Sequence, residues 1–262
     1  MHAAVRPPVV LIIAGNDPSG GAGLVADIQT VSALGGHPAP VISAITVQDT
    51  VNVQQVETVS PQFIASQAQA VLVDLPVAAI KLGLIVTAGA AQSIMQILKA
   101  HTEIPVVLDP VLAAGGGAQL VDETMINAYL ESLVPLATLI TPNTAESRRL
   151  APHANDTQSR AAALLARGCR HVLIKGADEG SSDVHNSFFS HDGTQRHFTW
   201  PRLPGNYHGS GCTLAAAIAT LLARGHSPLA AVEIAQRYTW ETLKQGWQLG
   251  KGQLIPNRQF TS

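Results

Sequence analysis

The sequence predicts an α/β protein in which helices cover both faces of a mainly parallel β-sheet. Short runs of Val, Ile and Leu alternate with amphipathic segments rich in Ala and Leu, and this alternation is typical of successive β-α-β units. The glycine clusters fall at turns from strand to helix, and no linker-like stretch divides the chain. We therefore expect residues 1–262 to form a single domain.

The expected elements follow one another in a regular order. Each strand is predicted where apolar residues form a short run, and each helix where apolar residues recur on one face of a helical period. The strands are expected at 9–14, 40–46, 78–82, 105–109, 137–141 and 171–175. The helices between them are expected at 23–34, 61–74, 87–100, 122–134 and 157–167.

A hairpin and two helices complete the expected fold. An Asp-Gly pair suits a tight turn, so residues 186–190 and 195–200 are expected to pair as an antiparallel hairpin at an edge of the sheet. A helix is expected at 213–223. A second one at 228–245 follows a serine cap and has a proline in its first helical position.

The composition limits the classes of partner and compartment. Charged residues make up 13% of the chain, which is low, so we expect part of the surface to be covered in a homo-oligomer, with a homodimer as its simplest form. A net charge of −2 gives no electrostatic basis for binding nucleic acid or an anionic membrane. Cys169 and Cys212 form neither a zinc motif nor a disulfide framework, and the apolar run at 9–14 is too short to span a bilayer. We expect a cytoplasmic protein.

The most informative motif is the junction between a glycine turn and an Ala-rich segment near the C-terminus. Gly209 and Gly211 let the backbone approach a ligand, and the helix after them offers unpaired N–H groups to an anion such as phosphate. Ser210 lies between them. The helix dipole is expected to favour the thiolate of Cys212, which could then act as a base or polar catalyst. The alternative is a glycine turn before a buried cysteine on a core helix.

Ligands of open parallel sheets bind at the carboxyl ends of the strands, so the loops there are expected to converge. In the first of them, Gly21, Gly23 and Ala26 formally fit a dinucleotide-binding fingerprint. The second strand ends at Gln48, where such a fold would place a carboxylate, so a loop that encloses a substrate is the preferred interpretation. Asp17 in this loop requires partners if it is buried. The converging loops are expected at 15–23, 47–52, 110–118, 142–146 and 176–183.

Polar residues at the other strand ends predict sites for a metal ion and a nucleotide. Asp109 and an Asn-x-x-Glu motif, Asn143 to Glu146, offer the oxygen ligands that Mg²⁺ prefers, although this motif is also a helix capping box and both roles are compatible. Lys175 can neutralise a phosphate or simply face solvent. The amide of Gln48 presents a donor and an acceptor in one plane, as a heteroaromatic ring requires, or else it is an ordinary surface glutamine.

An ordered set of motifs resembles the hydroxymethylpyrimidine/phosphomethylpyrimidine kinases of thiamine biosynthesis, which belong to the ribokinase-like superfamily. The order and spacing agree from residue 10 to about residue 240. The resemblance implies a three-layer αβα fold and the ATP- and Mg²⁺-dependent phosphorylation of 4-amino-5-hydroxymethyl-2-methylpyrimidine and then of its monophosphate. The motifs lie at 16–23, 48–50, 81–84, 108–111, 140–146, 174–176 and 209–213.

The resemblance also implies a role for each site residue. An anion hole would extend from Gly209 to Cys212, with the thiol beside the reacting hydroxyl. Lys175 would meet the nucleotide. Mg²⁺ would be organised by Asn143, Glu146 and Asp109. The residues that would hold the pyrimidine or shape its pocket are Gln48, Gly15, Asp17, Ala22, Leu84 and Val111.

The chain departs from the family pattern at the loop after Lys175. Asp178 stands where the family often has histidine, and the loop is acidic, so the nucleotide contacts there are the least defined. Pyridoxal kinase is the nearest alternative, because related enzymes share the cysteine-containing anion hole. An NAD-dependent oxidoreductase and a non-catalytic ligand sensor are the alternatives from other classes.

Overall fold

The computed structural model describes residues 6–260 and contains one continuous sheet of nine strands. The strands lie in the order β3-β2-β1-β4-β5-β6-β7-β8-β9, and those from β2 to β7 run parallel. The outer strands β3, β8 and β9 are antiparallel to their neighbours. Their bounds are β1 Val9–Asn16, β2 His37–Gln48, β3 Val53–Thr58, β4 Val77–Leu82, β5 Val106–Leu108, β6 Leu139–Ile140, β7 His171–Ile174, β8 Asp183–Ser190 and β9 Gln195–Pro201.

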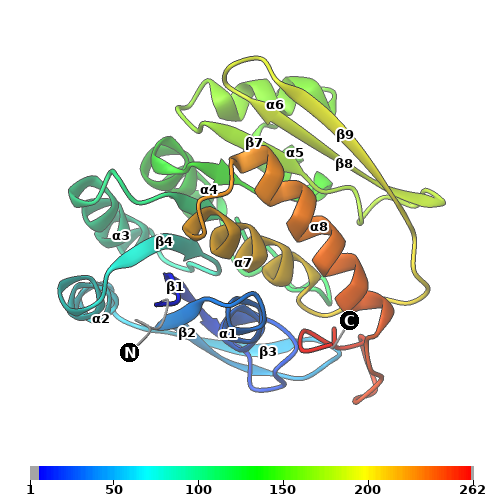
Figure 1. Ribbon diagram of the computed structural model, residues 1–262, viewed down its shortest axis with the longest axis horizontal. Helices are drawn as coiled ribbons and strands as arrows, with labels where there is room; N and C mark the ends of the chain where they lie inside the picture. The colour runs from blue at the N-terminus through cyan, green and yellow to red at the C-terminus, as the bar shows by residue number, and fades with distance from the viewer. Residues whose placement is uncertain (1–5, 261–262) are drawn as a thin grey trace, which may run out of the picture.

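Helices cover the sheet on both faces and complete three layers (Figure 1). Side chains of α2, α3, α4, α5 and α6 pack on one face, and those of α1, α7 and α8 pack on the other. The strand β1 shows why both faces are apolar, because its successive side chains alternate between the two cores. The helices are α1 Gly23–Ala33, α2 Pro61–Asp74, α3 Ala88–Ala100, α4 Glu123–Ala128, α5 Thr144–Leu150, α6 Thr157–Leu165, α7 Ser210–Ala223 and α8 Pro228–Lys244.

The fold class predicted from the sequence is confirmed, including the antiparallel hairpin β8–β9 at the sheet edge. Several details differ. The helix α5 was not among the expected helices, although a capping box was expected at its start. The strand β3 was not expected, because its polar residues do not alternate with apolar ones. The helix expected at 122–134 continues after Ala128 as a π-helical turn, Tyr129–Leu133, and Pro135 follows in a 3₁₀ turn. The helix expected from residue 213 begins at Ser210, so Cys212 lies in its first turn.

A buried ion pair joins α1 to the middle of the sheet. Lys81 on β4 donates to the Asp27 carboxylate at 2.7 Å, and neither side chain is exposed. Burial raises the pKa of Asp27 to about 6, although the Lys81 ammonium counteracts it. The pKa of Lys81 rises because the neighbouring carboxylates outweigh the effect of burial. Both groups are therefore charged at neutral pH and depend on each other.

Among the described residues, none of the helices has the length and apolar character to cross a membrane.

Replacing one partner of this pair is expected to destabilise the fold strongly. Lys81→Met leaves the Asp27 charge buried without a partner, so the free energy of unfolding in urea should fall by about 3–5 kcal/mol. Adding Asp27→Asn should recover part of this loss, because no buried charge then remains. The control is Lys99→Met, an exposed position on α3. A change below about 1 kcal/mol for Lys81→Met would show that the pair does not stabilise the fold.

Candidate active site

A cavity of about 180 Å³ lies at the carboxyl edge of the parallel strands. The loops at 15–23, 47–52, 110–118 and 142–146 contribute to it, as expected, whereas the loop at 176–183 contributes to a neighbouring cavity. Every residue that the sequence suggested for the site lines the first cavity. These residues are Gly15, Asp17, Ala22, Gln48, Leu84, Asp109, Val111, Asn143, Glu146, Lys175, Gly209, Ser210, Gly211 and Cys212.

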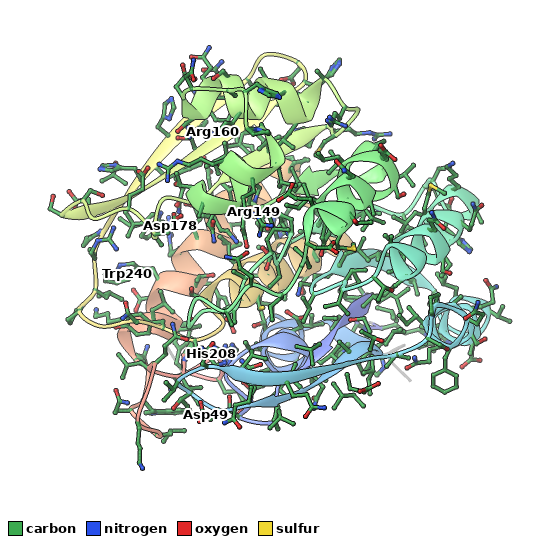
Figure 2. All side chains as sticks on the ribbon, turned by 180° about the vertical axis from the view of Figure 1, so that it is seen from behind. Asp49, Arg149, Arg160, Asp178, His208 and Trp240 are labelled. Atoms are coloured by element: carbon green, nitrogen blue, oxygen red, sulfur yellow. The ribbon has the colours of Figure 1, made fainter. Side chains whose placement is uncertain are left out.

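The neighbouring cavity is larger, with a volume of about 330 Å³. In Figure 2 the labelled Asp178 and Trp240, which line this larger cavity, lie above the labelled His208, which lines the smaller one. The two cavities share a wall. It is made by Asn143, Lys175, Tyr207, Ser210 and Gly211. A group held at this wall is therefore within reach of ligands in both cavities.

The shared wall contains the start of α7, where backbone amides are free. Gly209, with φ +74°, has the left-handed conformation, and a Cβ there would lie 2.1 Å from the carbonyl oxygen of Gly21. Among the described residues no acceptor is found for the N–H groups from Gly209 to Cys212, and α7 has no side-chain cap. Consecutive unpaired amides at a helix N-terminus bind anions. The geometry expected of an anion hole is present.

Cys212 is partly exposed at the wall of the smaller cavity. Burial raises the pKa of its thiol to about 11, and the Lys81 ammonium only partly opposes this effect. The expectation that the helix dipole favours the thiolate is therefore wrong for this structure. Desolvation is the main cause, the charges of Asp27 and Asp109 act in the same direction, and the thiol is neutral at physiological pH.

The carboxylate of Asp17 connects two loops that are far apart in the sequence. It accepts hydrogen bonds from the backbone N–H groups of Ser19 and Ala22, both at 2.8 Å, and from the Ser19 hydroxyl at 2.9 Å. Nε2 of His208 lies 2.8 Å from Oδ2 of Asp17. Burial acts to raise the pKa of Asp17, but these bonds outweigh it and lower the pKa. The expected partners of this buried carboxylate are thus present, and its contact with a substrate stays a prediction.

His208 also contacts the side-chain amide of Gln48, at 2.9 Å from Nε2 of the ring. Because the same ring nitrogen faces the carboxylate of Asp17, it carries a proton, and only the amide oxygen of Gln48 fits beside it. We assign that orientation, in which the amide nitrogen faces the hydroxyl of Thr46, 3.2 Å away. The Thr46 hydroxyl can accept this bond, because it donates its own proton to the carbonyl of Asn16. His208 therefore orients Gln48.

Lys175 is buried and faces the site, which excludes the alternative that it points to solvent. Its ammonium donates to Asp109 at 2.9 Å, and the hydroxyl of Thr141 donates to the same carboxylate oxygen at 2.9 Å. Burial opposes the charge of Lys175, but the carboxylates of Asp109 and Glu146 outweigh it and raise its pKa. Its Nζ lies 3.1 Å from the position that a Cβ on Gly211 would occupy. A fixed positive charge therefore stands beside the anion hole.

The capping box predicted for Asn143 and Glu146 is confirmed. The Asn143 side chain accepts from the Glu146 amide at 2.7 Å, and Glu146 accepts from the Asn143 amide at 2.8 Å. Burial raises the pKa of Glu146 to about 7, and the negative charge of Asp109 adds to this effect while Lys175 opposes it. No cluster of three or more His, Cys, Asp or Glu side chains suited to a metal ion occurs within residues 6–260. Two carboxylates suit Mg²⁺, which usually keeps several waters and binds substrate phosphates.

The acidic loop at 176–183 is held by contacts that the sequence did not indicate. Asp178 accepts from the backbone amides of Thr144 and Ala145, at 3.2 and 2.7 Å, and so caps the start of α5. Arg202 donates to three carbonyl oxygens of the same loop. The loop therefore forms a defined wall of the larger cavity, and the carboxylate of Asp178 is directed into α5.

Known proteins resemble this chain along nearly its whole length. The hydroxymethylpyrimidine/phosphomethylpyrimidine kinase of Salmonella typhimurium is 39% identical over 250 residues, which cover 92% of this chain and 94% of that protein. The thiamine biosynthesis bifunctional protein ThiED of Geobacter sulfurreducens is 41% identical over 249 residues, which cover 93% of this chain and 50% of that protein. A solved structure of pyridoxal kinase from Staphylococcus aureus in complex with pyridoxal has a TM-score of 0.88 and 27% identity, and covers 97% of this chain and 94% of its own.

The family assignment follows from these similarities and from the match of a family model. The solved structure supports the ribokinase-like fold that the motifs implied. The similarity to kinases favours the kinase hypothesis over the oxidoreductase and sensor hypotheses. The family model described as phosphomethylpyrimidine kinase matches residues 17–257. The chain therefore belongs to the phosphomethylpyrimidine kinase family.

Proposed function

We propose that this protein transfers the γ-phosphoryl group of ATP to the hydroxymethyl group of 4-amino-5-hydroxymethyl-2-methylpyrimidine, and in a second reaction to the monophosphate, for thiamine biosynthesis. The observation that carries the proposal is the free-amide hole from Gly209 to Cys212 at the wall shared by the two cavities. The smaller cavity suits the pyrimidine and the larger one suits the nucleotide. The relatives' names support this choice of substrate.

The pyrimidine would be oriented by Gln48. In the orientation assigned above, its amide is fixed by His208 and Thr46, and such fixed groups select between heteroaromatic rings. Gly15, Ala22, Leu84 and Val111 would shape the remaining wall. A Cβ at Gly15 would lie 3.1 Å from the end of the Leu84 side chain, so a side chain there would press on Leu84 and narrow the pocket. The pocket is thus suited to a flat ring that presents its alcohol to the hole.

The chain's own residues would position and stabilise the groups that react. The alcohol oxygen forms a bond to the γ-phosphorus, the bond from that phosphorus to the bridging oxygen of ADP breaks, and the alcohol proton ends on a phosphate oxygen. Because the thiol of Cys212 is neutral, it would orient the alcohol by a hydrogen bond rather than act as a strong base. The amides of the hole and Lys175 would stabilise the phosphoryl oxygens. Asp109, Asn143 and Glu146 would hold Mg²⁺, which neutralises phosphate charge when bound.

We also propose an oligomeric state and a cellular location for the protein. The outer face of β2 exposes Ile42, Ile45 and Val47, at 37%, 49% and 52% of their surface, and this apolar strip supports a homodimer formed across the β2–β3 ribbon. The free thiols support a reducing compartment, and we place the protein in the cytoplasm.

Pyridoxal kinase activity is the second candidate function, because a pyridoxal kinase shares the fold at a TM-score of 0.88.

Assays with purified protein, ATP and Mg²⁺ test the function. We expect a kcat/KM for the pyrimidine alcohol at least about tenfold above that for pyridoxal, measured by ADP release. A preference for pyridoxal would overturn the substrate assignment.

A cysteine variant tests the role of the thiol in the same assay. Cys212→Ala should lower kcat by at least about tenfold while changing the KM for the alcohol little, because the hydrogen bond of the thiol acts mainly in the transition state. The matched control is Cys169→Ala, at a buried cysteine.

Alkylation tests the protonation state of Cys212. Its pKa of about 11 lies above the ordinary value of 9.0, so the thiolate fraction at pH 8 should be reduced about a hundredfold. We expect iodoacetamide to modify Cys212 correspondingly slowly in the folded protein, with a rate that rises as the pH approaches about 10. Peptide mass spectrometry compares this rate with that in urea, where the thiol is ordinary. Rapid modification at neutral pH would contradict a neutral thiol.

The pKa of Glu146 predicts how Mg²⁺ dependence changes with pH. A carboxyl group with a pKa of about 7 is mostly neutral below that pH and ionised above it, so Mg²⁺ should activate at lower concentration as pH rises from about 6 to about 8. Glu146→Gln should weaken Mg²⁺ activation and flatten this dependence, while a glutamine keeps the capping box. Glu123→Gln, at an exposed side chain, is the control. An unchanged pH profile in Glu146→Gln would remove Glu146 from the metal site.

A further inference from the structure

Arg258 is the largest side chain in the described protein that is almost fully buried, at 2% exposure. It follows α8 in a segment that is paired with the loop before the anion hole, since His208 donates to the carbonyl of Leu254 at 2.8 Å. The hydroxyl of Tyr238 donates to the Arg258 carbonyl at 2.7 Å and fixes its backbone. Arg258 lies just beyond residues 17–257, which the family model matches. Its guanidinium donates to Thr213 Oγ1 at 2.8 Å, Gln29 Oε1 at 3.2 Å, Gly21 O at 2.5 Å, and Gly20 O and His208 O at 3.5 Å.

The charge of this guanidinium is not neutralised by a direct ion pair, and the carboxylates of Asp27 and Asp17 attract it only from farther away. All of its acceptors are carbonyl, amide or hydroxyl oxygens, and no carboxylate lies within salt-bridge distance of Arg258 among residues 6–260. Burying a cation without a direct ion pair is unfavourable, because the charge loses its hydration. A site that keeps such a charge is favourable for an anion that arrives nearby.

The position of this charge connects it to the anion hole. Nη2 of Arg258 lies 2.9 Å from where a Cβ on Gly209 would stand, so no side chain separates them. The carbonyl of His208 points to Arg258, and in a trans peptide the N–H of Gly209 then points the opposite way. That N–H is one of the amides without a protein acceptor. Arg258 therefore polarises and orients a donor of the hole from behind.

We propose that Arg258 is a positioning residue for phosphoryl transfer, which supplies a fixed positive charge beneath the anion hole, holds the peptide unit between His208 and Gly209 that belongs to the hole, and holds the Gly21 carbonyl beside it. This inference rests on the proposed kinase function and deepens it. The side chain touches no ligand cavity and acts through the peptide between His208 and Gly209. Its effect should appear in turnover, because negative charge is spread over the phosphoryl oxygens during transfer.

Three substitutions separate charge from shape. Arg258→Lys keeps the charge. Arg258→Gln keeps hydrogen-bond donors without the charge. Arg258→Met fills part of the volume without a charge or a hydrogen-bond donor. We expect kcat to fall by about 10- to 100-fold in the Gln and Met variants and by less than about threefold in the Lys variant, with the KM for the alcohol within about threefold throughout. The matched control is Arg224→Gln. Arg224 is an exposed arginine at the far end of α7, and it donates to the backbone carbonyl of Leu34. Gln29→Ala, which removes one acceptor of Arg258 without changing charge, should keep the wild-type kcat.

The outcomes separate this inference from the assignment of the substrate. Both the pyrimidine alcohol and pyridoxal are offered to the wild-type protein, and the variants are measured with the alcohol that it phosphorylates. A wrong substrate therefore leaves the test of Arg258 intact. The inference is overturned by an unchanged kcat in Arg258→Gln, by equal losses in the Lys and Gln variants, or by failure of both neutral variants to fold, since each result assigns Arg258 a purely structural role or none.

Discussion

The contact between the carboxylate of Asp17 and the ring of His208 joins two glycine-rich loops, and the site depends on it. One loop follows β1 and the other precedes α7, so the contact spans 191 positions in the sequence. Gly21 leaves room for the ring, since a Cβ there would lie 2.2 Å from it. The same ring orients Gln48 in the smaller cavity, while the residue after it opens the anion hole. A single side chain thus links the cavity proposed for the substrate to the amides proposed to bind phosphate.

Negatively and positively charged side chains alternate around the anion hole. Asp27 faces Lys81, and Asp109 faces Lys175, with Glu146 close to that second pair. Each lysine stays charged because carboxylates surround it, and burial keeps the thiol of Cys212 neutral among them. The groups proposed to act on an anion are therefore held by contacts within the protein, which limits reorganisation during reaction.

Much of this arrangement could be predicted from the sequence because parallel strands bring their carboxyl ends to one edge. Asp109, Asn143 and Lys175 each follow such a strand, and their meeting follows from topology alone. The contacts of Lys81, His208 and Arg258 could not be predicted, because their partners are 54, 191 and up to 238 positions away. The thiol of Cys212 was misjudged for a related reason. The helix dipole is visible in a local motif, whereas the degree of desolvation depends on the packing of the whole site.

The pairing of Leu254 and Arg258 with the loop before α7 has a consequence for the order of folding. Within residues 6–260, every strand of the sheet and every helix that covers it precedes this segment in the sequence. The two apolar cores can therefore form before the loop ahead of α7 gains its support from behind. Completion of the candidate site is thus a late step of folding, separable from formation of the core.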